Sequence, residues 1–150
     1  MRFIRPAVAE EIIYIKADGS VEGTDKIKRD GNVYTFTDNI YNEIVVEKDN
    51  IVVDGTSYTL EGTRVQDSKG IYLSEISNVT IRNINIKAFW YGILLENSSN
   101  NMIYGNELTN NSYYSIKLYE STNNSIHRNE VTDSCGGVWF DAFSNHNSIS

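Results

Sequence analysis

Apolar residues alternate with polar ones in short segments that recur along the chain at a nearly fixed step. The segments GIYL, GILL, SIKL and GVWF start at residues 70, 92, 115 and 137, which are 22 or 23 residues apart. Within each segment, apolar side chains stand at every second position, the period of a β-strand with one buried face. A column of isoleucines keeps the same step: Ile81, Ile103, Ile126 and Ile149. Two independent columns with one period indicate a repeat protein.

Each repeat contains a further apolar position, filled in turn by Ile86, Leu108 and Val131. Three short strands per repeat predict an all-β fold, a parallel β-helix whose turns lie about 4.8 Å apart. We predict one domain over residues 1–150, with an N-terminal cap and irregular first turn over 1–42. About five to six repeat turns would fill 43–150. The sequence stops midway through a repeat, which predicts that further turns follow in a longer protein.

Asparagine recurs where the repeats must bend. One column contains Asn78, Asn100, Asn123 and His146, with Asn101, Asn124 and Asn147 beside it. A second contains Asn106 and Asn129, with Ile84 as its odd member. We expect these amides to form structural ladders, because stacked side chains can hydrogen-bond to one another and to the bend backbone.

With these columns aligned, the sequence resembles the right-handed parallel β-helix repeat proteins, in particular the NosD-like group, described as periplasmic copper-binding, and its archaeal surface relatives. The segments at 13–40, 91–111 and 116–131 carry the likeness. The resemblance implies a right-handed coil, an extracellular or cell-envelope location, and a sugar-related or surface role. Fold is implied more specifically than function, since one coil supports many activities.

Composition narrows the set of partners and cofactors. The chain has 13 basic and 20 acidic residues, a net charge of −7, which disfavours a nucleic-acid partner. It has no apolar run of about 18 residues, so no membrane span is predicted, and no signal peptide is visible. Copper prefers clustered Met, Cys or His, whereas the candidates Met102, His127, Cys135 and His146 fall in unrelated columns. We therefore expect no metal site or cofactor beyond weak Ca²⁺ binding at Asp-containing bends.

Candidate catalytic residues are expected at the outward-facing positions of the first strand in each repeat. These positions form two columns: Tyr72, Leu94, Lys117, Trp139, and Ser74, Glu96, Tyr119, Asp141. Glu96 and Asp141 would stand two turns or about 10 Å apart, near the upper limit for an inverting glycosidase pair. Lys117 could neutralise a uronate and Tyr119 could donate a proton. The other interpretation of these four residues is an ordinary solvated face.

Aromatic residues are plentiful, with 10 Tyr and 2 Trp. Trp90 and Tyr113 fall at equivalent bends, whereas Tyr72, Tyr119 and Trp139 lie on the outward face. Exposed rings stack on sugars, so these five are candidate ligand-binding residues, unless they only pack against the coil.

We predict a non-catalytic extracellular or envelope-associated scaffold or carbohydrate-binding module, whose partner would be a polysaccharide or cell-surface glycan. One alternative is a polysaccharide lyase, hydrolase or epimerase that acts on a uronic-acid-containing glycan through Glu96, Lys117, Tyr119 and Asp141. Another is a structural segment of a surface layer or adhesin.

Overall fold

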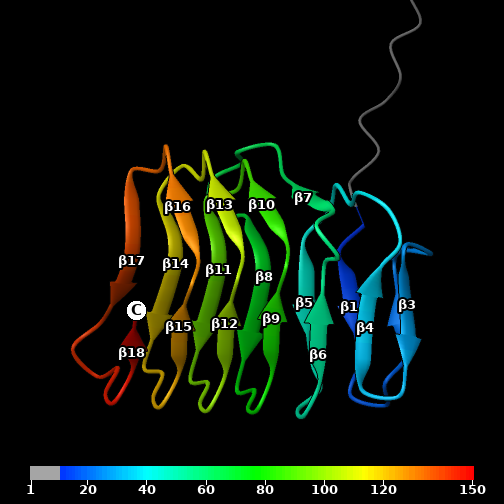
Figure 1. Ribbon diagram of the computed structural model, residues 1–150, viewed down its shortest axis with the longest axis horizontal. Coiled ribbons are helices and arrows are strands. Elements are labelled where there is room, and N and C mark those ends of the chain that lie inside the picture. The colour runs from blue at the N-terminus through cyan, green and yellow to red at the C-terminus, as the bar shows by residue number, and fades with distance from the viewer. Residues whose placement is uncertain (1–10) are drawn as a thin grey trace, which may run out of the picture.

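The computed structural model describes residues 11–150, which form a parallel β-helix of about five turns with no helices (Figure 1). Its strands build three sheets, of which two have seven strands and one has four. The first sheet contains, in spatial order, β17 (Gly136–Phe140), β14 (Tyr114–Tyr119), β11 (Tyr91–Glu96), β8 (Lys69–Ser74), β5 (Ile44–Val46), β1 (Ile13–Ile15) and β2 (Val21–Glu22). The predicted all-β solenoid is confirmed.

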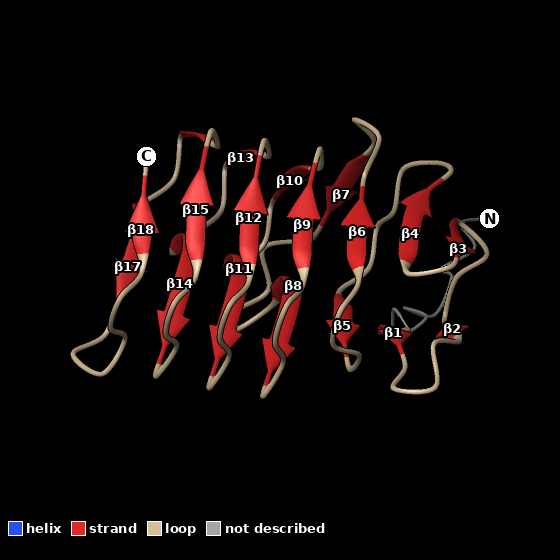
Figure 2. Cartoon of the chain, turned by 60° about the horizontal axis from the view of Figure 1, so that its bottom comes forward, coloured by secondary structure: helices blue, strands red, loops and turns tan. Residues whose placement is uncertain are grey.

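The other two sheets close the coil. The second contains β18 (Ser148–Ile149), β15 (Ser125–His127), β12 (Met102–Tyr104), β9 (Thr80–Arg82), β6 (Val52–Asp54), β4 (Val33–Phe36) and β3 (Ile27–Asp30). The third contains β16 (Glu130–Thr132), β13 (Glu107–Thr109), β10 (Asn85–Lys87) and β7 (Thr59–Glu61). Figure 2 shows the successive strands of the second sheet side by side.

The register follows the repeat. Ile103 pairs with Ile81 and with Ile126, and all three are at most 2% exposed. Stacking identical side chains from successive turns builds one apolar column that no single turn could bury. At the N-terminal end, β2 and β3 run antiparallel to β1 and β4 and occupy the outer edges of two sheets. Of the segment predicted as a cap, residues 1–10 lie outside the described residues.

Neighbouring asparagines at the bends have different structural roles: the first adopts a left-handed backbone conformation, and the second is buried. Asn78, Asn100 and Asn123 are exposed and adopt the left-handed conformation, with φ of 56°, 58° and 55°. Asn accepts this conformation better than most residues, because its short polar side chain can hydrogen-bond locally. The buried ladder runs instead through the next residue in each turn, Asn101 and Asn124, which are at most 2% exposed.

Ladders of buried polar side chains occur at four positions of the repeat. In the turn that begins with β8, the four positions are apolar: Ile76, Val79, Ile84 and Phe89. Their backbone N–H groups donate to side-chain oxygens of Ser98, Asn101, Asn106 and Asn111 in the next turn, at 2.8–3.2 Å. One turn further on, Asn129 accepts from the N–H of Asn106 at 3.0 Å. Since a buried N–H without a partner is costly, each ladder residue satisfies the turn before it.

Candidate functional site

The outer face of the first sheet brings together three columns of side chains from successive turns. The first contains Lys69, Tyr91, Tyr114 and Gly136; the second contains Tyr14, Val45, Tyr72, Leu94, Lys117 and Trp139; the third contains Ser74, Glu96 and Tyr119, followed by Asp141 just beyond β17. The strand register therefore places the predicted site residues as the repeat spacing requires.

Five aromatic rings meet on this face in a continuous cluster. Trp90 stacks on Tyr113 with ring centroids 5.3 Å apart, and Tyr114 stacks on Trp139 at 5.7 Å. Tyr113 and Tyr114 join the two stacks, with centroids 4.4 Å apart, and Tyr91 meets Tyr113 edge-on at 6.0 Å. We call these five rings together with Lys117 the aromatic strip.

Local backbone geometry explains how the strip forms. The pairs Trp90–Tyr91 and Tyr113–Tyr114 occupy the same place in successive turns, at the bend before a first-sheet strand. Gly136 follows in that column, and a Cβ atom there would collide with the ring of Tyr114. The glycine therefore leaves the space that the tyrosine ring occupies.

Lys117 lies between two of the rings. Its Nζ is 5.0 Å from the centroid of Tyr91 and 5.1 Å from that of Trp139, distances at which a cation is attracted to the ring faces. Among residues 11–150, no acidic side chain forms an ion pair with Lys117. Its neighbour in the same outward column, Leu94, is only 2% exposed. The strip therefore adjoins a covered apolar side chain and contains a cation without an acidic partner.

Tyr72, another predicted ligand residue, is held by its neighbours. Its hydroxyl donates to Oε2 of Glu96 at 2.5 Å, and Nζ of Lys69 lies 5.3 Å from its ring centroid. Burial raises the pKa of Tyr72, and the hydrogen bond to Glu96 raises it further. Glu96 thus fixes Tyr72 on the face.

The remaining catalytic candidates lie in the third column, where Tyr119 stands between Glu96 and the strand end at Asp141. The carboxylate of Glu120 raises the pKa of Tyr119, and burial and the carboxylates of Asp141 and Glu96 act in the same direction. Tyr119 is therefore a weaker acid than a free tyrosine and stays protonated at neutral pH.

The Asp141 side chain accepts hydrogen bonds at the bend that follows β17. Its Oδ1 accepts hydrogen bonds from the Ser144 hydroxyl at 2.5 Å and from the Glu120 N–H at 3.0 Å. Burial raises the pKa of Asp141, but these hydrogen bonds outweigh burial and the pKa lies below its usual value. A general acid needs the opposite direction, whereas the ionised member of a carboxylate pair does not. The role of Lys117, Tyr119, Glu96 and Asp141 as one catalytic set stays a prediction.

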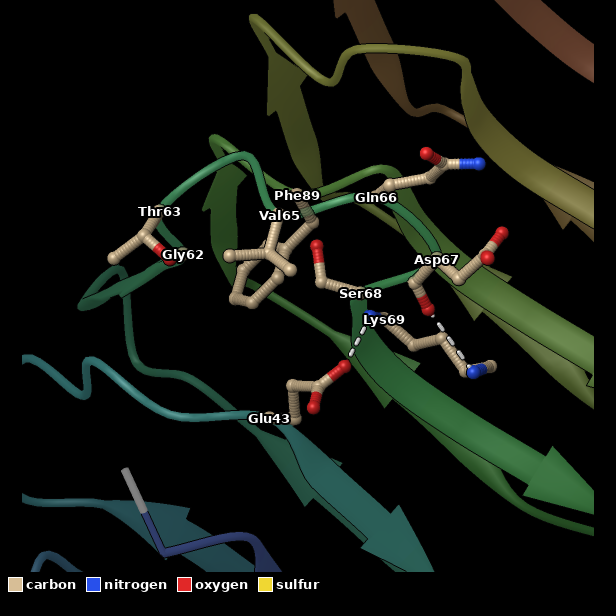
Figure 3. Close-up of a pocket in the computed structure, with 9 residues that line it drawn as sticks. All are labelled: Glu43, Gly62, Thr63, Val65, Gln66, Asp67, Ser68, Lys69 and Phe89. Atoms are coloured by element: carbon tan, nitrogen blue, oxygen red, sulfur yellow. Dashed lines mark hydrogen bonds between the residues drawn. The ribbon is translucent and has the colours of Figure 1, made fainter. Parts of the chain in front are cut away.

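A pocket of about 250 Å³ opens where the chain departs from the repeat, at the loop over residues 62–68. Figure 3 shows Glu43, Ser68 and Lys69 around it, with the Phe89 ring among the lining side chains. A neighbouring hollow of about 210 Å³ shares Glu43 and Lys69 and adds Ile12, Val45 and Tyr72. Because Ser68 accepts the N–H of Trp90 at 3.0 Å, the loop directly adjoins the aromatic strip.

Sequence reasoning missed Lys69, Tyr91, Tyr114 and this loop. The recurring aromatic pairs at 90–91 and 113–114 were the signal for the two tyrosines. For the loop, the signal was the longer segment between the strands at 59–61 and 69–74.

The family model described as "Periplasmic copper-binding protein (NosD)" matches residues 7–150. The chain belongs to the NosD family. No curated protein and no solved structure gave a match. The description of the NosD family as periplasmic indicates a location in the cell envelope or outside the cell. Residues 11–150 contain no helix long and apolar enough to cross a membrane.

The donors of this NosD chain do not fit a copper ion within the described range. Residues 11–150 hold no group of three or more His, Cys, Asp or Glu side chains that could bind a metal. The His127 ring lies against Tyr104 with centroids 4.8 Å apart, whereas Cys135 is exposed at a different bend. Copper sites need several soft or imidazole donors at one point, and His127 and Cys135 do not provide one.

Proposed function

We propose that this NosD-family protein is a non-catalytic, envelope-associated or extracellular β-helix that binds a glycan on its aromatic strip. The observation that carries the proposal is the continuous cluster of five rings on one outer face. Aromatic side chains combine apolar area with polar tips, as a sugar surface requires.

The mutual stacking of the rings favours binding. Trp90 holds Tyr113, and Trp139 holds Tyr114, so these side chains are ordered before any ligand arrives. Binding then loses little side-chain entropy. A stack that only stabilised the coil would cover its rings, yet Tyr113 remains 41% exposed.

The strip also suits an extended ligand. It spans the turns that begin with β11, β14 and β17, which lie about 4.8 Å apart as neighbouring strands of one sheet. A glycan laid along the coil axis would meet at least one aromatic ring at each of these turns. A polymer of repeated units fits such a surface better than a small compact molecule.

A catalytic function is the second candidate, because Glu96, Tyr119 and Asp141 share one column beside the strip. The lowered pKa of Asp141 speaks against a general-acid role for its carboxyl, and the raised pKa of Tyr119 makes its hydroxyl a weaker proton donor. A surface-layer or adhesin segment without a small ligand is the third. This third function predicts that substitutions in the aromatic strip leave the binding of its partners unchanged.

Glycan-array and affinity-electrophoresis measurements test the proposal on wild type, Trp139→Ala and a control, Tyr58→Ala. Tyr58 is 37% exposed and lies before β7, away from the strip. We expect the wild type and the control to be retained by the same glycans, and Trp139→Ala to bind about tenfold more weakly. Equal retention of all three proteins would refute the strip as the site.

A further inference from the structure

Charge is unevenly distributed on the outer face of the first sheet. The protein carries a net charge of −7, and acidic side chains gather at the carboxyl ends of the strands: Glu75, Glu96, Glu120 and Asp141. Two lysines, Lys69 and Lys117, lie among the aromatic rings instead. Both lysines therefore lie against rings, while Glu43 accepts the backbone N–H of Lys69 and Glu96 accepts the Tyr72 hydroxyl.

The ammonium groups of both lysines contact rings and backbone, whereas the Glu43 carboxylate accepts the backbone N–H of Lys69. Lys117 lies between Tyr91 and Trp139, whereas Nζ of Lys69 lies over Tyr72 and donates to the backbone oxygen of Asp67 at 3.1 Å. Neither forms an ion pair with an acidic side chain of residues 11–150. An ammonium held by rings keeps much of its charge available for an anion, since the rings bear no formal charge.

The two lysines stand in neighbouring columns of the sheet. Lys69 belongs to β8 and Lys117 to β14, with β11 between them, so their strands are two turns or about 10 Å apart. Lys69 shares its column with Tyr91, and Lys117 shares the next column with Leu94, so the two residues of the middle turn lie between the lysines. Two cations on strands two turns apart, with an aromatic and apolar surface between them, match a chain that carries acidic groups at intervals.

We infer that the ligand of the strip is an anionic glycan, which runs along the coil axis and places carboxylate or sulfate groups on Lys117 and Lys69. This inference rests on the proposed function and names its ligand class. Lys69 also lines both hollows beside the loop over 62–68, where Glu43 lies with it. Away from the lysines, the acidic strand ends repel a polyanion and restrict it to the strip.

Calorimetric titrations with matched probes test the inference. The carboxylate arm compares a galacturonate hexamer with its methyl ester, which has the same backbone without charge. The sulfate arm compares chondroitin sulfate with desulfated chondroitin. We expect the charged member of at least one pair to bind about tenfold more tightly, with an affinity that falls as salt rises. The arm that responds identifies the acidic group.

Variants separate this inference from the proposed function. Lys117→Met keeps the aliphatic stem and should weaken binding of the charged probe about tenfold, whereas Lys117→Arg should preserve it. Lys28→Met, on exposed β3, serves as the control. If a neutral glycan binds equally well, and Trp139→Ala abolishes its binding while Lys117→Met does not, the inference fails and the proposed function stands. If no glycan binds the wild type, both fail.

Discussion

The backbone N–H of Asn101 donates a 2.9 Å hydrogen bond to the side-chain oxygen of Asn124, the equivalent residue of the next turn. The Asn124 amide also donates to the backbone oxygen of Ser98 at 3.0 Å. Each amide therefore joins two turns at a bend, where strand pairing alone leaves backbone groups without partners.

Asn124→Ala should reduce the free energy of unfolding by about 3 kcal/mol, because a buried N–H and a buried carbonyl lose their partners. The adjacent Asn123→Gly is the matched control. Asn123 is exposed with φ of 55°, so glycine should change stability by less than about 1 kcal/mol. Urea unfolding measures both, and equal midpoints for the two variants would contradict the ladder.

Gly92→Ala should destabilise the protein by about 2 kcal/mol, because a Cβ there would lie 2.5 Å from the backbone oxygen of Ser115. Gly137 occupies the same repeat position, but nothing lies within 4 Å of its Cβ direction. Gly137→Ala should therefore be tolerated. Thermal unfolding of the two variants checks this contrast, and similar losses in both would show that the interior is packed differently.

The free energy of unfolding should fall at acidic pH, because Asp54 becomes protonated. Burial raises the pKa of Asp54, but hydrogen bonds from the Thr56 N–H, Arg82 and Asn83 outweigh burial and hold the pKa below its ordinary value of 3.8. A carboxyl whose pKa is lower in the folded state stabilises the fold above about pH 4 and loses that contribution as pH falls through the folded value.

Asp54→Asn should consequently be less stable than wild type at pH 7 and should lose less on acidification. Denaturant unfolding at several pH values between 7 and 3 provides the comparison. Parallel stability curves for the two proteins would exclude Asp54 as a source of the acid sensitivity.

Asp141→Ala should lower stability without removing an activity, because its Oδ1 accepts hydrogen bonds at the bend from Ser144 and Glu120. The wild type should release no reducing ends or unsaturated products from a panel of uronic-acid polysaccharides. Turnover that disappears in both Asp141→Asn and Lys117→Met, while both variants stay folded, would instead establish the catalytic alternative.

The coil could be predicted from sequence because each turn repeats the same local pattern. Ile81, Ile103 and Ile126 report the register directly, since parallel stacking places equal repeat positions in contact. The sequence does not distinguish the buried amide column from the exposed one, because Asn100 and Asn101 stand side by side. Each column has one exception in four turns, His146 in the exposed column and Val79 in the buried one.

The strip was only partly predictable for a physical reason. Strict alternation from Ile93 and Leu95 would point Tyr91 inward. The structure places Gly92 against the interior, where a Cβ would meet Leu108 and Ser115, so two consecutive residues, Gly92 and Ile93, face inward and Tyr91 turns out toward Lys117. The pattern of apolar residues does not reveal such a shift, because glycine has no side chain that would identify its position as inward-facing.

Tryptophan fluorescence tests the central claim most directly, because the only two tryptophans of the chain, Trp90 and Trp139, both belong to the strip. Titration with a glycan selected on the array should produce a saturable change in emission, with the same dissociation constant as calorimetry. Calorimetric binding of that glycan without any change in tryptophan emission would contradict the assignment of the strip as the binding surface.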